Sequence, residues 1–185
     1  MLMGLVVLFL FLFTVVLCCI FIVRFGMFIL KKKPFPKKLS AFCLAGIVTL
    51  LIISGYQTYF FTFDETKGNI NQEPVESPNG TYTAVRYDLP YGGAAGGVNV
   101  RVQVRENGTN NDPGTVYFAD AKRQFQLEWE DNSTLKVTNK SLEYPDSNRS
   151  VELDVEDEVY HETGRACKSW LLKDEYDTCY QHESS

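Results

Sequence analysis

The sequence predicts two N-terminal transmembrane α-helices, forming a hairpin, followed by a small, mainly-β antiparallel domain (a sheet or a sandwich) outside the cytoplasm. Three observations predict this fold class. Residues 1–63 contain both long apolar runs and no Asp or Glu. Residues 64–185 contain all 23 Asp and Glu residues. Five or six short segments in that second half are rich in β-branched and aromatic residues, which often alternate with polar ones. Turn residues separate these segments, and this pattern is typical of β-strands.

Two apolar runs are long enough to cross a bilayer. The first extends from residue 2 to residue 30 with a single charged residue, Arg24, and the second extends from residue 39 to about residue 61. A helix of about 20 apolar residues spans a hydrocarbon core of about 30 Å. The first run lacks a basic start and a small-residue cleavage site, so we expect a retained helix rather than a signal peptide. We therefore expect transmembrane helices over residues 1–30 and 39–63.

A basic loop separates the two predicted helices. Residues 31–38 contain five lysines: Lys31, Lys32, Lys33, Lys37 and Lys38. Short loops rich in Lys and Arg remain cytoplasmic, and Arg24 can extend its side chain to the headgroups near the same end. We therefore expect a two-pass protein of the cell membrane, with the lipid bilayer as a partner and with both termini and the C-terminal domain extracytoplasmic. Aromatic residues between residues 56 and 63 predict an interfacial belt at the outer end of the second helix.

The charge of the outer half restricts its partners. Residues 64–185 carry 12 Lys and Arg against 23 Asp and Glu, a net charge of −11, and the anchor carries +6, which together give the total of −5. We exclude nucleic acid as a partner, because phosphate contacts require basic surfaces. The charge is consistent with solubility alone or with a cationic partner.

Cys167 and Cys179 are the two cysteines outside the predicted membrane helices. An outer compartment permits disulfides, so we predict a bridge between them. In the chain-entropy description, closing a loop of about 13 residues stabilises a fold by about 3 kcal/mol. Free thiols or a metal-binding pair remain alternatives, although no second ligand pair accompanies the two cysteines.

The predicted strands follow a polar stalk over residues 64–76 and begin a domain over residues 77–185. Ser77–Gly80 is a turn, and Leu89–Gly97 is a flexible glycine-rich loop. The predicted strands are Thr81–Asp88, Val98–Arg105, Thr115–Ala119, Phe125–Glu130, Thr134–Thr138 and Ser150–Val155. In Val98–Arg105 the valines alternate with polar residues, which predicts one buried face and one wet face. We expect Thr163–Tyr180 to be a disulfide-tied coil or one short helix, with Trp170 and Leu171 capping the sheet.

Several short motifs resemble a family of small membrane-anchored proteins of unknown function from Bacillus and related Firmicutes. The motifs are Ser77–Tyr82, Tyr91–Ala94, Val116–Phe118, Leu127–Asn132 and Leu153–Val155. The resemblance covers roughly residues 77–160. It implies a Gram-positive envelope setting, and it supplies neither an activity nor catalytic residues.

Two groups of residues are candidates for binding. Glu152, Asp154, Glu156 and Glu158 occupy alternate positions, and on a continuing strand they would form one acidic face that could hold Ca²⁺ or a basic partner. The competing interpretation is a solvated or charge-protected strand edge. In the glycine-rich loop the candidates are Tyr91, Gly92, Gly93, Gly96 and Gly97, which could dock a partner strand or peptide or could simply form a hairpin loop.

We assign no catalytic residue, no metal ligand and no cofactor. His161 and His182 are the only histidines, and neither belongs to a recognisable catalytic motif. Five Asn-x-Ser/Thr triplets lie in predicted turns, where Asn has a backbone role independent of glycosylation. The sequence therefore favours an extracytoplasmic module that binds a protein, a peptide or a cell-wall component, such as an accessory or immunity-type protein. The alternative is an envelope hydrolase or a calcium-dependent module that uses the acidic face.

Overall fold

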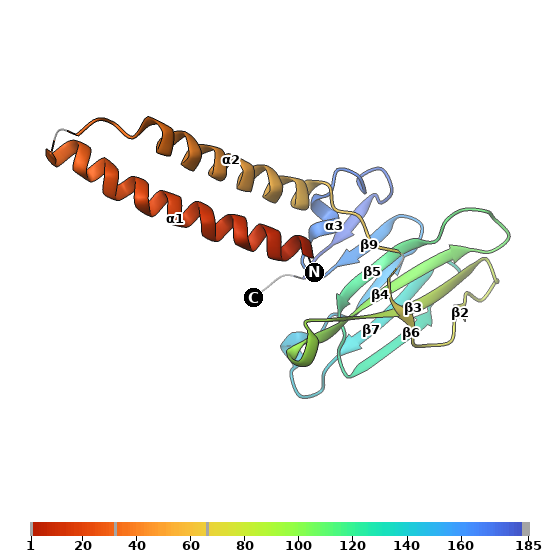
Figure 1. Ribbon diagram of the computed structural model, residues 1–185. Helices are drawn as coiled ribbons and strands as arrows, with labels where there is room; N and C mark the ends of the chain where they lie inside the picture. The colour runs from red at the N-terminus through yellow and green to blue at the C-terminus, as the bar shows by residue number, and fades with distance from the viewer. Residues whose placement is uncertain (1, 32, 66, 183–185) are drawn as a thin grey trace. The chain divides into compact units, whose positions relative to one another are not determined.

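The computed structural model describes residues 2–31, 33–65 and 67–182, so Lys32 of the predicted topology set lies outside the described residues. The chain divides after Thr58 into two compact units. The first contains helix α1 (Leu2–Lys31) and helix α2 (Lys37–Tyr59) except its last residue, Tyr59, and the second contains the β-domain (Figure 1). By length and composition both helices are long and apolar enough to cross a membrane.

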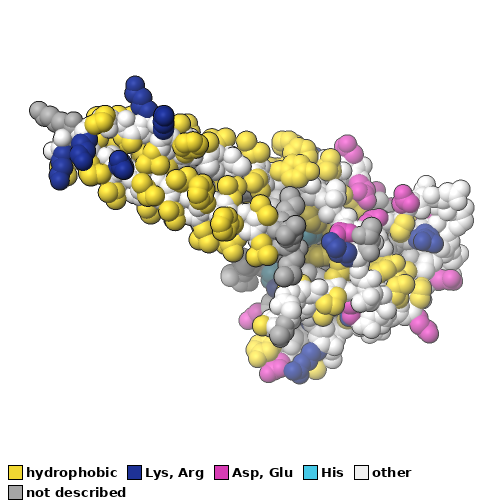
Figure 2. Space-filling view, in the orientation of Figure 1, with side chains coloured by type: hydrophobic (Ala, Val, Ile, Leu, Met, Phe, Trp, Pro, Cys, Tyr) yellow, Lys and Arg dark blue, Asp and Glu magenta, His cyan; other side chains and the backbone are white. Residues whose placement is uncertain are grey.

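The helices lie side by side in an antiparallel pair (Figure 1). Thr14 of α1 is only 4% exposed, and a Cβ added to Gly46 of α2 would lie 2.7 Å from its Oγ1 atom. The absence of a side chain at Gly46 therefore allows the two backbones to approach closely. Figure 2 shows apolar side chains over these helices and basic side chains at the end where they are connected.

The β-domain begins earlier than the sequence indicated. Helix α2 ends at Tyr59, and residues 60–63, which we had expected to be helical, leave the helix. The expected stalk contains two short strands, β1 (Asn69–Ile70) and β2 (Val75–Glu76), and both pair with β3. Part of the stalk is therefore an edge of the sheet.

The strands form two sheets (Figure 1). Over the described residues, the larger has seven strands in the order β1-β3-β4-β5-β9-β10, with β2 also paired to β3. Its longer members are β3 (Tyr82–Tyr91), β4 (Gly97–Glu106), β5 (Gly114–Asp120), β9 (Glu158–His161) and β10 (Thr178–Tyr180). The smaller sheet contains β6 (Gln124–Trp129), β7 (Thr134–Lys140) and β8 (Val151–Asp154).

The larger sheet is mixed, whereas we had predicted an antiparallel one. Strand β9 pairs in parallel with β5 and also with β10. The chain leaves the small sheet at Asp154, turns over residues 155–157 and enters the large sheet beside β5. Because this connection changes sheets instead of forming a hairpin, the strand direction is not constrained to alternate.

Side chains from both sheets form one hydrophobic core, so the domain is a sandwich. Fully buried residues include Val100 and Val102 from the large sheet and Leu135, Val137 and Leu153 from the small one. The predicted inward positions of these residues are confirmed. Each fully buried Val or Leu side chain contributes about 1.5–3 kcal/mol to folding.

The middle of the second face of β4 is buried too, which corrects the prediction of a wet face there, whereas Arg105 on the same face is exposed as expected. Arg101 is 1% exposed and Gln103 is 4% exposed. The Arg101 guanidinium donates hydrogen bonds to the backbone carbonyls of Asp64 and Glu65, and it lies 4.9 Å from the centre of the Tyr87 ring. The chain that follows α2 therefore covers this face, and burial lowers the pKa of Arg101.

The predicted disulfide is confirmed, with an S–S distance of 2.06 Å between Cys167 and Cys179. It connects helix α3 (Arg165–Lys168) to β10, so this segment is indeed a tied coil with one short helix. The predicted capping residues are wrong, because Trp170 is 61% exposed and Leu171 is 54% exposed. Leu172, their neighbour, is buried instead, at 7% exposure.

Candidate functional site

The predicted glycine-rich binding loop is a tight hairpin connection between β3 and β4. Gly92 and Gly93 have φ values of 77° and 65°, which L-amino acids with a side chain rarely adopt. A Cβ on Gly96 would lie 1.6 Å from the Tyr91 carbonyl oxygen. The Tyr91 hydroxyl donates to Asp120 Oδ1 at 3.0 Å, and a Cβ on Gly97 would lie 2.6 Å from the same hydroxyl oxygen. The turn geometry alone thus explains these glycines, and their role in binding stays a prediction.

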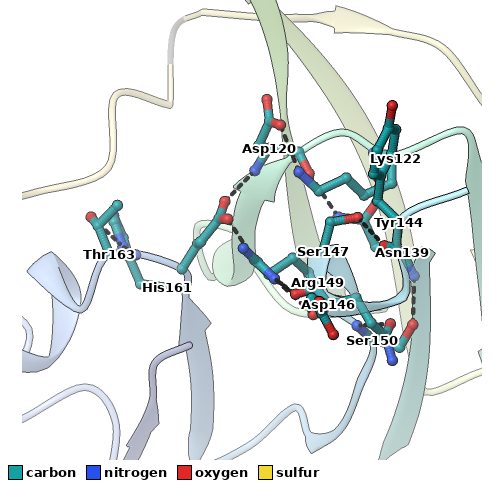
Figure 3. A network of polar contacts seen from close by, with 12 residues as sticks. Asp120, Lys122, Asn139, Tyr144, Asp146, Ser147, Arg149, Ser150, His161 and Thr163 are labelled. Carbon is teal, nitrogen blue, oxygen red and sulfur yellow. Dashed lines mark hydrogen bonds and ion pairs between the residues drawn. The ribbon is translucent and has the colours of Figure 1, made fainter. Parts of the chain in front are cut away.

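Asp120 belongs to a polar network that joins the two sheets (Figure 3). Its backbone N–H donates to Glu162 Oε2 at 2.7 Å, and its carboxylate pairs with Lys122 Nζ at 2.8 Å. The other oxygen of Glu162 accepts from Arg149 Nε at 2.5 Å. Two anions therefore face two cations, which leaves no net charge to attract a ligand.

Asn139 of β7 completes this network from the smaller sheet. It is 0% exposed, donates to the Tyr117 hydroxyl and to the Asp120 carbonyl, and accepts from the Lys122 N–H. Because every polar atom of the Asn139 amide has a partner, the network can be buried without an unpaired group. Its contacts indicate a structural role.

The four predicted acidic residues do not share one strand face. Strand β8 ends at Asp154 and β9 begins at Glu158, with a turn between them. Lys136 lies 2.6 Å from Glu152, and the Asp154 carboxylate accepts the Glu156 backbone N–H at 3.1 Å.

The carboxylates of Glu156 and Glu158 accept hydrogen bonds from tyrosine hydroxyls. Tyr82 donates to Glu156 at 2.7 Å, and Tyr180 donates to Glu158 at 2.7 Å. Among the described residues, no group of three or more His, Cys, Asp or Glu side chains is arranged to hold a metal ion. The calcium interpretation therefore has no geometric support in the part of the chain that the structure describes.

Glu156 instead lies in an acidic groove that the sequence did not reveal. The groove has a volume of about 300 Å³ and is lined by side chains from β3, β4, β5, the turn after β8 and the C-terminal segment. Its lining residues are Tyr82, Val104, Glu106, Asn111, Asp112, Gly114, Val116, Val155, Glu156, Glu175 and Tyr176. Four of them carry carboxylates, and none is Lys, Arg or His.

Carboxylates of the groove also raise the pKa of Tyr82, which lines it, and of Glu65, which does not. The hydrogen bond to Glu156, together with burial, raises the pKa of Tyr82 to about 12. Burial raises the pKa of Glu65. The negative charges of Glu175 and Asp112 raise this pKa further, whereas the positive charge of Arg101 lowers it. A negative, partly enclosed surface attracts cations and favours a positively charged ligand.

The groove was missed because its members are far apart in the sequence. Glu106 ends β4, Asp112 lies in the connection to β5, and Glu175 lies within the disulfide loop. The net charge of −11 over residues 64–185 was the one signal of an acidic surface, and it does not indicate where the carboxylates gather.

His161 is buried in an aromatic cluster and is 2% exposed. Its ring stacks on Phe118 at 5.1 Å, meets Phe61 edge-on at 5.1 Å, and lies 6.0 Å from Phe63. Its Nδ1 atom accepts the Thr163 N–H at 3.2 Å. Burial lowers the pKa of His161 to about 4, so the ring is neutral near pH 7. These contacts indicate that His161 has a packing role. They also show that Phe61 and Phe63, which were expected in the interfacial belt, pack inside the β-domain unit.

Comparison with known families gives one match. Residues 36–161 match the family of unknown function DUF5412, which covers more than half of the chain. The chain belongs to the DUF5412 family. The DUF5412 match includes α2, the chain that follows it, and the strands through β9, and it leaves α1 and the disulfide outside. No curated protein and no solved structure matches the chain.

Proposed function

We propose that this DUF5412 protein is a membrane-anchored binding module whose acidic groove receives a cationic group of a partner protein, peptide or cell-wall component. In this proposal α1 and α2 cross the cell membrane of a Gram-positive bacterium, the lysine-rich loop is cytoplasmic, and the sandwich is extracytoplasmic. The positive loop supports this orientation, because short basic loops remain inside.

The observation that carries the proposal is the composition of the groove. Its four carboxylates come from four separate segments, and no basic side chain in the lining neutralises them. Tyr82 and Tyr176 add aromatic rings to the same surface, and such rings attract ammonium and guanidinium groups. An ion pair at an exposed site contributes about 0.2–1 kcal/mol, so several together can give a weak but selective interaction.

Binding can be tested on the full chain in lipid nanodiscs by isothermal titration calorimetry. The probes are a lysine-rich hexapeptide and the same peptide with acetylated side chains, which has no side-chain charge. We expect heat with the first and none with the second, and weaker binding at high salt, because salt screens exposed charges. Equal binding of both peptides would contradict a charge-selective groove.

A matched pair of triple variants tests the location of the site. The groove variant carries Glu106→Gln, Asp112→Asn and Glu175→Gln. The control variant carries Glu73→Gln, Glu128→Gln and Asp146→Asn, which are exposed positions outside the groove lining. Both variants remove three negative charges, so we expect about a tenfold loss of affinity or more in the groove variant only. Equal losses would show that the peptide responds to net charge and not to the groove.

The orientation is tested separately by treating intact protoplasts with protease. We expect the β-domain to be cleaved from the outside while the loop between α1 and α2 stays protected. Survival of the β-domain in intact protoplasts, with cleavage only after lysis, would reverse the proposed topology.

A further inference from the structure

An exposed aromatic patch lies where the β-domain begins. It consists of Tyr59, Phe60, Trp170 and Leu171, which are 45%, 39%, 61% and 54% exposed. The Trp170 ring is centred 5.2 Å from the Tyr59 ring and 5.5 Å from the Phe60 ring. Residues more than 100 positions apart therefore form one apolar surface.

Hydrogen bonds hold the two halves of the patch together. The backbone N–H of Trp170 donates to the Tyr59 carbonyl at 2.8 Å, and the Ser169 hydroxyl donates to the Phe61 carbonyl at 2.6 Å. Tyr59 is the last residue of α2, so its carbonyl is one of those that a helix end leaves without an intrahelical partner. The disulfide at Cys167 limits the movement of the segment that carries Trp170.

The segment around Trp170 has a charge opposite to that of its domain. Residues 163–173 contain Arg165, Lys168 and Lys173 and no carboxylate, whereas residues 64–185 as a whole have a net charge of −11. All three cations are exposed. Tryptophan and leucine flanked by basic residues are typical of surfaces that enter the lipid interface, where the rings reach the acyl boundary and the cations meet anionic headgroups.

We propose that the aromatic patch inserts into the membrane interface beside anionic phospholipid headgroups. The β-domain then touches the bilayer through Trp170 and Leu171 as well as through the chain that leaves α2. The occupant is lipid, because Tyr59 closes a helix with the length and composition of a membrane span, and because the flanking cations complement phosphate. The inference depends on the proposed membrane insertion of α2, and it is independent of the acidic groove.

Fluorescence quenching by brominated lipids tests this contact on the full chain in liposomes. The chain has two tryptophans, and the Trp129 indole N–H is held by the Val75 carbonyl in the sandwich. The Trp170→Phe variant therefore reports Trp129 alone, and its difference from the wild type reports Trp170. We expect brominated acyl chains to reduce the Trp170 signal about twofold, since interfacial apolar residues enter about 5–10 Å into the boundary between headgroups and acyl chains. The Trp129 signal of the variant should stay unchanged.

Lipid charge provides a second measurement. We expect stronger quenching of Trp170 in liposomes that contain phosphatidylglycerol than in pure phosphatidylcholine. The triple variant Arg165→Gln, Lys168→Gln and Lys173→Gln should lose that difference. Flotation of the liposomes separates the two proposals. A chain that floats with the lipid but shows no Trp170 quenching overturns this inference alone, whereas a chain that does not float overturns the membrane anchor as well.

Discussion

The burial of His161 predicts that the stability of the β-domain falls as the pH is lowered towards 4. The pKa of the folded state is about 4, against an ordinary value of 6.5. The unfolded chain therefore binds the proton first, and stability rises with pH between these two values. The contribution is fully present above about pH 6.5 and is lost as the pH falls from there through about 4.

The size of the effect follows from the two pKa values. A difference of 2.5 pKa units, from 6.5 to about 4, corresponds to about 3 kcal/mol in total. At pH 5 the unfolded state is mostly protonated and the folded state is mostly neutral, so about 2 kcal/mol of stability is already lost relative to pH 7.5. His161 is 2% exposed, so solvent screening reduces this value little.

The assay is urea unfolding of the full chain in detergent micelles, followed by tryptophan fluorescence at pH 5 and at pH 7.5. The comparison is His161→Phe, which keeps a ring in the aromatic cluster and removes the titrating group. Glu65 and Asp131 also have shifted pKa values, raised and lowered respectively, but they contribute equally to both proteins. We expect the wild type to lose about 2 kcal/mol more than the variant over this interval. Parallel pH profiles of the two proteins would refute the reasoning, whatever their absolute stabilities.

Three further predictions concern the packing of the β-domain. Leu135→Ala should lower the free energy of unfolding by about 2–5 kcal/mol, because Leu135 is 0% exposed in the shared core. Leu142→Ala should change it little, because Leu142 is 77% exposed. Equal effects in urea titrations would contradict the sandwich core. Replacing Cys167 and Cys179 by Ser should cost about 3 kcal/mol, and reductant should give the same loss in the wild type but none in the variant. Gly96→Ala should destabilise the β3–β4 connection by about 2 kcal/mol or more, because the added Cβ would overlap the Tyr91 carbonyl oxygen. Unchanged thermal stability would show that the connection adopts another path.

The local pattern of the sequence was sufficient for the parts of the protein whose cause is local. Two apolar runs separated by a basic loop indicate two helices, because length and apolarity are properties of contiguous residues. The alternation in β7 predicted the burial of Leu135 and Val137, and the structure confirms both. The two cysteines outside the helices likewise pointed to their disulfide.

Local patterns misled where a distant segment supplies the environment. The alternation in β4 correctly placed its valines in the core, but it could not show that the chain after α2 covers Arg101 and Gln103 on the other face. In the C-terminal segment Trp170, Leu171 and Leu172 are all apolar, and only the fold distinguishes the buried Leu172 from its two exposed neighbours.

The sequence by itself determined that this chain has two membrane-length helices, an acidic β-domain and one disulfide, because each of these depends on composition or on short-range order. The tertiary structure alone decided which carboxylates meet in the acidic groove and which aromatic residues gather in the patch. Glu106 and Glu175 line one groove, and Tyr59 and Trp170 share one surface, although long stretches of chain separate the members of each pair. The folding of the whole domain brings these distant residues together, and the periodicity of a segment identifies its buried face without identifying the distant segment that covers it.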